Sequence, residues 1–171
     1  MVELFPIKIY KGSLIPSEEQ KISTENQLQE IFNSCDKNYW TGESGFSTGQ
    51  KNLTLYNDID LSWFFEGIQN NVFEYWDSLN YQKMNIFIDS CWANLHRLHD
   101  TTTEHSHSDG FYGSNIISGV YYFKKPNGIG NIKFCNPLDY IIRMTPYKDM
   151  KGIDTISQEI VTDQYDYILF P

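Results

Sequence analysis

The chain has 171 residues, of which 40% are hydrophobic and 20% are charged, and this composition predicts one globular domain rather than a disordered segment. Its 13 Lys and Arg residues face 22 Asp and Glu residues, for a net charge of −9. That balance argues against nucleic-acid partners, which need clustered positive charge, and against binding to an anionic membrane surface. No apolar run approaches the ~20 residues of a membrane span. The N-terminus does not read as a secretory signal, and the three cysteines show no CxxC spacing, so we expect a cytoplasmic protein.

The N-terminal half predicts one strand and two helices. The strand covers Leu4–Tyr10, where every second residue is apolar. Ser17 and Gln20 form a capping-box pattern, which predicts the start of the first helix. A second helix is predicted from near Asp60, because apolar residues recur there at helical spacing. These residues are Leu61, Phe64, Phe65, Ile68, Val72, Phe73, Trp76 and Leu79.

After Asn80 the hydrophobic period shortens to two residues, which predicts strands. The predicted strands lie at residues 86–97, 101–103 with continuation into the histidines, 115–125, 129–135, 139–144 and 156–170. A turn at Pro126-Asn127-Gly128 predicts that the segments 115–125 and 129–135 pair as a hairpin. Helices followed by runs of strands predict a single α+β domain over residues 1–171, mainly β, with a sandwich or jelly-roll core covered by N-terminal helices.

All four histidines lie in one short stretch of the chain: His96, His99, His105 and His107. If the predicted strand continues through them, His105, His107 and Asp109 point to the same face. Imidazole and carboxylate ligands together suit iron, zinc, copper or nickel, and two histidines with one carboxylate form the ligand set of non-haem Fe(II) oxygenases. The alternative is a pair of exposed histidines followed by a turn at Asp109. The pattern by itself leaves both interpretations open.

Four short motifs follow one another around the histidines: Trp92-Ala93-Asn94, His105-Ser106-His107, Ser118-Gly119-Val120-Tyr121-Tyr122 and Gly130-Asn131-Ile132-Lys133-Phe134-Cys135-Asn136-Pro137. In this order they resemble the 2-oxoglutarate/Fe(II) oxygenases of marine bacteria and their phages, and the resemblance runs over nearly the whole chain. It implies a double-stranded β-helix (a jelly-roll, cupin-like core), Fe(II) as cofactor and 2-oxoglutarate as co-substrate. The implied reaction is hydroxylation of an unidentified small-molecule or peptidyl substrate, in the host cytoplasm if a phage encodes the chain.

The resemblance also implies a set of metal ligands. His105 and His107 match the family's paired ligands. Several extra residues after Asp109 keep open an alternative in which His107 and Asp109 form the pair. Family members continue past a Phe-Pro pair to a third histidine ligand and to a basic residue that binds 2-oxoglutarate. Because this chain ends at Pro171, we expect the domain to lack its last strands here and the polypeptide to continue.

Three further residues have roles implied by the resemblance. Asn94 would hydrogen-bond the keto-acid carboxylate, unless its side chain bonds within the sheet. Tyr121 or Tyr122 would reach the co-substrate through its phenol, unless its ring is part of the core.

Two other classes of function stay open. One is a degenerate jelly roll that serves as a metal-binding or structural module without oxygenase activity. The other is a cupin-like enzyme that uses another metal without 2-oxoglutarate, with His96 or His99 completing the metal shell. A homodimer is common among such folds, and no residue decides the oligomeric state.

Overall fold

The computed structural model describes residues 7–34, 45–107, 116–137 and 157–171, and this part of the chain contains two α-helices. Helix α1 (Glu18–Ser34) begins at the predicted capping box. The Ser17 amide donates to Gln20 Oε1 at 2.8 Å, and the Gln20 amide donates to Ser17 Oγ at 3.2 Å. Helix α2 (Ser62–Ser78) begins where Asp60 Oδ1 accepts hydrogen bonds from the amide and the hydroxyl of the first helical residue. Both predicted helix starts are confirmed.

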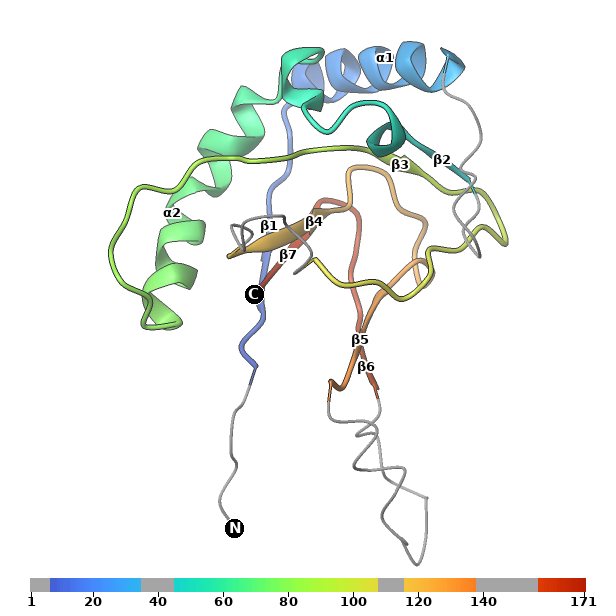
Figure 1. The fold of residues 1–171 in the computed structure, drawn as a ribbon. Coiled ribbons are helices and arrows are strands. Elements are labelled where there is room, and N and C mark those ends of the chain that lie inside the picture. The colour runs from blue at the N-terminus through green and yellow to red at the C-terminus, as the bar shows by residue number, and fades with distance from the viewer. Residues whose placement is uncertain (1–6, 35–44, 108–115, 138–156) are drawn as a thin grey trace, which may run out of the picture.

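The central sheet combines strands that lie far apart in the sequence. It contains β1 (Tyr10–Ser13), β4 (Ser118–Tyr121) and β7 (Asp166–Phe170), in the order β1-β7-β4 with both pairings antiparallel. Two smaller antiparallel pairs are β2 (Phe46–Ser47) with β3 (Asn94–Leu95), and β5 (Ile132–Cys135) with β6 (Ser157–Ile160). Short 3-10 helices at Thr48–Gln50 and Leu55–Asn57 follow β2. In Figure 1 the two α-helices lie around one side of the molecule, and the β5–β6 ribbon extends away from them.

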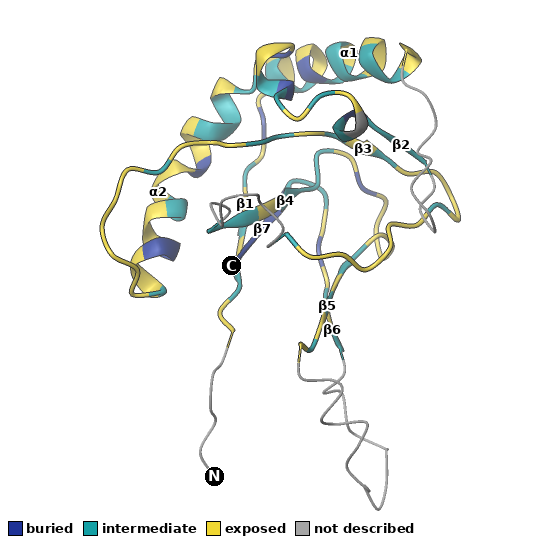
Figure 2. Ribbon diagram, in the orientation of Figure 1, coloured by how far each residue is buried: buried dark blue, intermediate teal, exposed yellow. Residues whose placement is uncertain are grey.

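The main hydrophobic cluster lies between α2 and the central sheet. Tyr167 and Leu169 of β7 pack with Ile68 and Tyr75 of α2, and none of the four is more than 9% exposed. Side chains alternate along a strand, so Ile168 and Phe170 face the opposite side of the sheet. All residues of β7 are nevertheless buried, as the dark blue strand at the centre of Figure 2 shows. The second face of β7 is therefore covered as well, and on this face Phe170 contacts His107.

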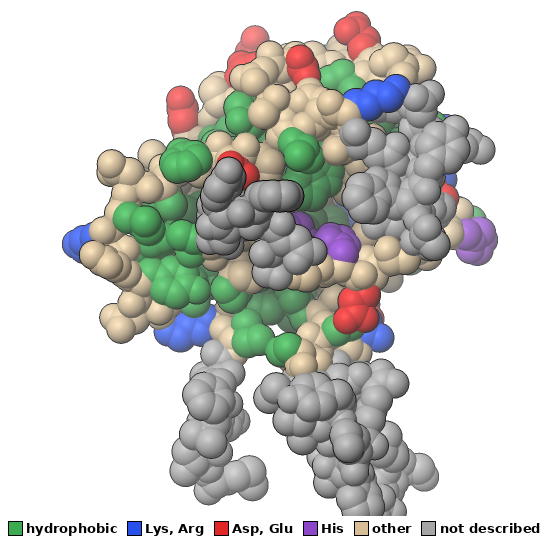
Figure 3. Space-filling model, viewed as in Figure 1, with side chains coloured by type: hydrophobic (Ala, Val, Ile, Leu, Met, Phe, Trp, Pro, Cys, Tyr) green, Lys and Arg blue, Asp and Glu red, His purple; other side chains and the backbone are tan. Residues whose placement is uncertain are grey.

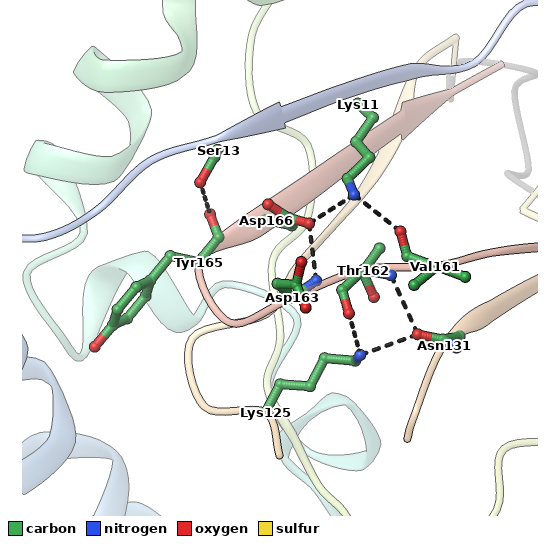
Figure 4. Close-up of polar contacts among 9 residues, drawn as sticks. All are labelled: Lys11, Ser13, Lys125, Asn131, Val161, Thr162, Asp163, Tyr165 and Asp166. Atoms are coloured by element: carbon green, nitrogen blue, oxygen red, sulfur yellow. Dashed lines mark hydrogen bonds and ion pairs between the residues drawn. The ribbon is translucent and has the colours of Figure 1, made fainter. Parts of the chain in front are cut away.

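Polar side chains tie the start of β7 to β1 and to the segment before β7 (Figure 4). The Lys11 ammonium donates to the Val161 carbonyl at 2.9 Å and forms an ion pair with Asp166 at 2.9 Å. The Asp163 amide donates to the same Asp166 carboxylate at 2.8 Å. The carboxylate is thus held by a charged donor and a backbone donor at once.

The neighbouring part of this network holds the β4–β5 connection against the chain that follows β6. Lys125 is only 6% exposed, and its ammonium donates to the Thr162 carbonyl and, at 3.0 Å, to Asn131 Oδ1. The Thr162 amide donates to the same Asn131 oxygen at 3.1 Å. The ammonium also lies 5.5 Å from the ring centre of Tyr122. The ammonium of this buried lysine is thus satisfied by a carbonyl oxygen, an amide oxygen and the face of an aromatic ring.

Asp166 predicts an acid-sensitive contribution to stability. Burial by itself raises the pKa of Asp166. Hydrogen bonds from Lys11 and the Asp163 amide lower it by a larger amount, so the net pKa lies below the ordinary value. The pKa of an aspartate in the unfolded chain is about 3.9, so the ionised Asp166 stabilises the fold above that pH. This contribution is lost as the pH falls through the lower folded pKa.

We expect Asp166→Asn to lower the free energy of unfolding by about 1–2 kcal/mol at neutral pH. The difference from the wild type should shrink as the pH falls below ~4, where the wild-type carboxylate also becomes neutral. Urea unfolding over this pH range measures both effects. Asp163→Asn is the matched control, because Asp163 is exposed and contributes its backbone amide to the network. Equal acid sensitivity of wild type and Asp166→Asn would contradict the prediction.

The predicted hairpin between residues 115–125 and 129–135 is wrong. β4 pairs with β7 and β5 pairs with β6, so the two neighbouring strands enter different sheets. The intervening turn exists, with positive φ angles of 77° at Gly128 and 68° at Gly130. The apolar strand β7 is buried between β1 and β4, and burying that strand favours the long-range pairing over the local one.

Most of the strand predicted at 86–97 is also wrong. Between residues 81 and 107 only Asn94–Leu95 forms a strand, and Cys91 adds one isolated bridge to Thr54. Phe87 is 80% exposed, so the alternating pattern here does not mark a buried face. The strand expected over Leu4–Tyr10 instead covers Tyr10–Ser13, and residues 156–170 contain two strands rather than one. The strand predicted at 139–144 lies outside the described residues.

At the level of class, the α+β prediction is confirmed: two α-helices accompany small antiparallel sheets in the described part of the chain. Neither of these helices combines the length and the apolar character needed to cross a membrane.

Candidate functional site

The segment that leads to the histidines is fixed by backbone hydrogen bonds to the segment after β2. The Thr48 amide donates to the Ala93 carbonyl at 3.0 Å, and the Ala93 amide donates to Thr48 Oγ1 at 3.0 Å. Two residues earlier, the Cys91 amide donates to the Leu53 carbonyl, and the Cys91 carbonyl accepts from the Leu55 amide at 3.0 Å. Residues 91–93 therefore have a defined position although only a short strand follows them.

The chain then reverses direction between β3 and residue 100. Asp100 Oδ2 accepts from the Arg97 amide at 2.8 Å, the Arg97 carbonyl accepts from the Asp100 amide at 3.0 Å, and His99 has a φ angle of 71°. Gly45, with a φ of 93°, packs beneath the reversal. A Cβ atom there would lie 2.7 Å from the Leu95 carbonyl oxygen, so the position requires glycine. The reversal returns the chain toward Trp92.

The two predicted metal ligands lie side by side. The ring centres of His105 and His107 are 4.9 Å apart, with 42° between the ring planes. The two residues belong to an irregular segment rather than to the strand that was predicted for them. His105 Nδ1 is 2.8 Å from the Thr103 carbonyl oxygen. Because a carbonyl can only accept, Nδ1 carries the proton, and in the neutral ring Nε2 keeps the lone pair that a metal needs.

His107 is enclosed by aromatic rings. Trp92 stacks on it with ring centres 6.0 Å apart and an interplanar angle of 16°, and Phe170 of β7 meets it edge-on at 5.5 Å. Phe134 of β5 contacts Phe170 in turn, with ring centres 5.1 Å apart. Figure 3 shows histidine side chains (purple) beside hydrophobic side chains (green) near the middle of this face.

These surroundings favour the neutral form of His107. Burial lowers its pKa, and the nearby charge of His105 lowers it further. Neutral imidazole is the form that binds metals. The pair therefore offers two nitrogen donors at the edge of an aromatic wall built from three segments of the chain.

The other candidates for the metal shell lie elsewhere. His96 Nε2 is 3.1 Å from Thr102 Oγ1, and His99 is exposed at the chain reversal. Asp109 lies outside the described residues. Within the ranges that the structure describes, no three His, Cys, Asp or Glu side chains come together as a metal-binding group. The described part of the site is thus a pair of imidazoles.

Tyr121, one of the residues expected to bind the co-substrate, is not brought to the histidine pair. Tyr121 pairs directly with Tyr167, so its side chain faces α2, on the opposite side of the sheet from Phe170. Its hydroxyl donates to the Leu14 carbonyl at 2.8 Å, and its ring packs on Phe64 at 4.6 Å. Burial raises its pKa, so the phenol stays neutral.

Tyr122 and Asn94 occupy different places. The ring of Tyr122 is half-buried beside Lys125, and burial raises its pKa despite hydrogen bonds that act in the other direction. Asn94 lies on β3 opposite Ser47 and is exposed. Asn94 is two residues from Trp92 and so remains close in sequence to the aromatic wall.

Sequence reasoning did not identify the wall itself. Phe134 and Phe170 are ordinary apolar positions of predicted strands, and their meeting depends on long-range pairing. Trp92 belongs to the Trp92-Ala93-Asn94 motif, but the motif does not predict a contact with His107. The turn that supports Trp92 contains Thr48 and Gly49. Its only signal in the sequence is a Ser-Thr-Gly run within a polar stretch, which is a weak one.

No model of a known protein family matches the chain, and no curated protein matches it either.

Proposed function

We propose that this chain forms the core of an Fe(II)- and 2-oxoglutarate-dependent dioxygenase, with its small antiparallel sheets as parts of a double-stranded β-helix. The observation that carries the proposal is the juxtaposition of His105 and His107 on the second face of β7. The ordered motifs around the pair support the same family.

The donor set present suits the proposed metal. Imidazole nitrogen is a common ligand of Fe(II), and the hydrogen bond from His105 Nδ1 to a carbonyl is the usual way in which proteins fix the tautomer of a ligating histidine. His105 and His107 would hold the metal, with Asp109 as the alternative to one of them. Bound iron with 2-oxoglutarate supplies the oxidising chemistry for C–H hydroxylation, which no amino-acid side chain supplies.

The chain's own residues would prepare the site in two ways. His105 and His107 bind as neutral donors, because burial lowers the pKa of His107 and a carbonyl directs the proton of His105 to Nδ1. The rings of Trp92 and Phe170, the latter packed on Phe134, would shield the His107 side of the pair from water. The substrate, small or peptidyl, would approach from the exposed His105 side.

The proposal predicts consumption of 2-oxoglutarate that depends on metal and oxygen. The protein, loaded anaerobically with Fe(II) and 2-oxoglutarate and then exposed to O₂ with ascorbate as reductant, should convert 2-oxoglutarate to succinate and CO₂, with the second oxygen atom of O₂ reduced to water in the absence of the substrate. The protein without iron and the iron-loaded protein kept anaerobic are the controls, and succinate is measured by mass spectrometry.

The other classes of function give different results in the same experiment. Metal binding that 2-oxoglutarate does not alter, with no succinate formed, would favour a cupin-like enzyme of other chemistry. Absence of metal binding would contradict the proposal and favour a degenerate structural or interaction module.

A further inference from the structure

Trp92 contacts both a tight turn of the backbone and the imidazole of His107. Its ring approaches Gly49, where a Cβ atom would lie 3.0 Å from Trp92 Cγ and 3.1 Å from Cδ1. It also stacks on His107 with an interplanar angle of 16°. The indole is still 37% exposed, so it is not simply one more side chain of the buried core.

The support beneath the indole is well fixed. Thr48 is only 4% exposed, and its amide and hydroxyl both bond to Ala93, the residue next to Trp92. Ser47 Oγ accepts a hydrogen bond from the Gly49 amide at 3.2 Å, which closes the turn. The position of the indole is therefore set by hydrogen bonds from a segment more than 40 residues away in the sequence.

The contacts of His107 suggest what this arrangement does. The Trp92 ring lies nearly parallel to the imidazole, with ring centres 6.0 Å apart, and Phe170 meets it at 84°, so the two contacts restrict the tilt of the ring about different axes. A metal ligand whose ring plane is held in advance loses less conformational freedom on binding. Groups around a ligating histidine commonly fix the orientation of its ring, and the stacked indole is one such group beside His107.

We propose that Trp92 is a positioning residue that orients His107 for metal binding, an inference that rests on the metal site proposed above. Gly49 is part of the same arrangement, because a Cβ atom there would come so close to the indole that the ring would have to shift by a few tenths of an ångström.

Titration with Co(II), a redox-stable substitute for Fe(II), tests the proposal without relying on turnover. Trp92→Phe keeps a flat ring on His107 and should bind Co(II) within about threefold of the wild type, whereas Trp92→Leu should bind about 10–100-fold more weakly. Trp76→Phe is the control, because Trp76 is a buried tryptophan of α2 that packs on Tyr81. Bound Co(II) should quench tryptophan fluorescence in the wild type and in Trp76→Phe, and much less in Trp92→Phe.

A second variant keeps the test decisive if Trp92→Leu folds poorly. Gly49→Ala retains the indole but displaces it, and it should weaken Co(II) binding by a smaller factor than Trp92→Leu. Wild-type affinity in Trp92→Leu and in Gly49→Ala, with only the unfolding midpoint lowered, would make Trp92 a purely structural residue and leave the metal site intact. Failure of the wild type itself to bind Co(II) would overturn the metal site and the positioning role together.

Discussion

His105→Ala and His107→Ala are each expected to weaken metal binding at least ~100-fold, more than the loss of a residue that only supports a ligand. Each substitution removes one of the two nitrogen donors that the structure brings together. His105 is exposed, so its replacement should change the free energy of unfolding by no more than about 0.5 kcal/mol. Calorimetric titration with Co(II), together with urea unfolding of each variant, separates loss of the ligand from loss of the fold.

Two further variants make this experiment specific. His99→Asn removes an exposed histidine at the chain reversal, and asparagine tolerates the positive φ angle of that position, so metal affinity should stay unchanged. Asp109→Ala distinguishes the two possible ligand pairs. Loss of binding in Asp109→Ala, with wild-type affinity in His105→Ala, would show that the pair is His107 with Asp109.

Ile168→Ala is expected to lower the free energy of unfolding by about 2–5 kcal/mol. Ile168 is fully buried at the centre of β7, where it pairs with Lys11 on one side and Val120 on the other. Its truncation leaves a cavity that a sheet bonded along both edges of β7 cannot easily close. Urea unfolding followed by far-ultraviolet circular dichroism measures the effect.

Val161→Ala is the matched aliphatic control, because Val161 lies just before β7 and is 64% exposed. Its replacement should change the stability by no more than about 0.5 kcal/mol. Similar losses in both variants would mean that β7 is not the buried centre of the sheet.

The features that sequence predicted correctly are those set by neighbouring residues. The capping box at Ser17 and Gln20 and the apolar stripe of α2 involve residues three or four positions apart, and both helices begin where expected. The proximity of His105 and His107 follows in the same way from their separation by a single residue.

The features that sequence did not predict depend on distant partners. The local turn at Gly128 favoured a hairpin, but β4 is paired with β7. Alternation at residues 86–97 implied a sheet, but a strand needs a neighbour, and a neighbouring backbone is paired only with the part from Cys91 to Leu95. The face on which Tyr121 lies depends on its register with Tyr167, which a single sequence does not reveal.

The central place of β7 also has a consequence for the order of events during synthesis. The ribosome makes β1 early, but Tyr10 pairs with Leu169, so β1 must wait for almost all of the described chain before it gains its partner. Contacts between such distant segments slow folding, because a long loop must close before they form. The two α-helices can form while the chain is still emerging, whereas the wall around His107 is completed only when Phe170 arrives. A nascent chain would therefore hold His107 without its enclosure until translation of this region is finished. If the proposed metal site exists, it would be completed only when the sheet is assembled.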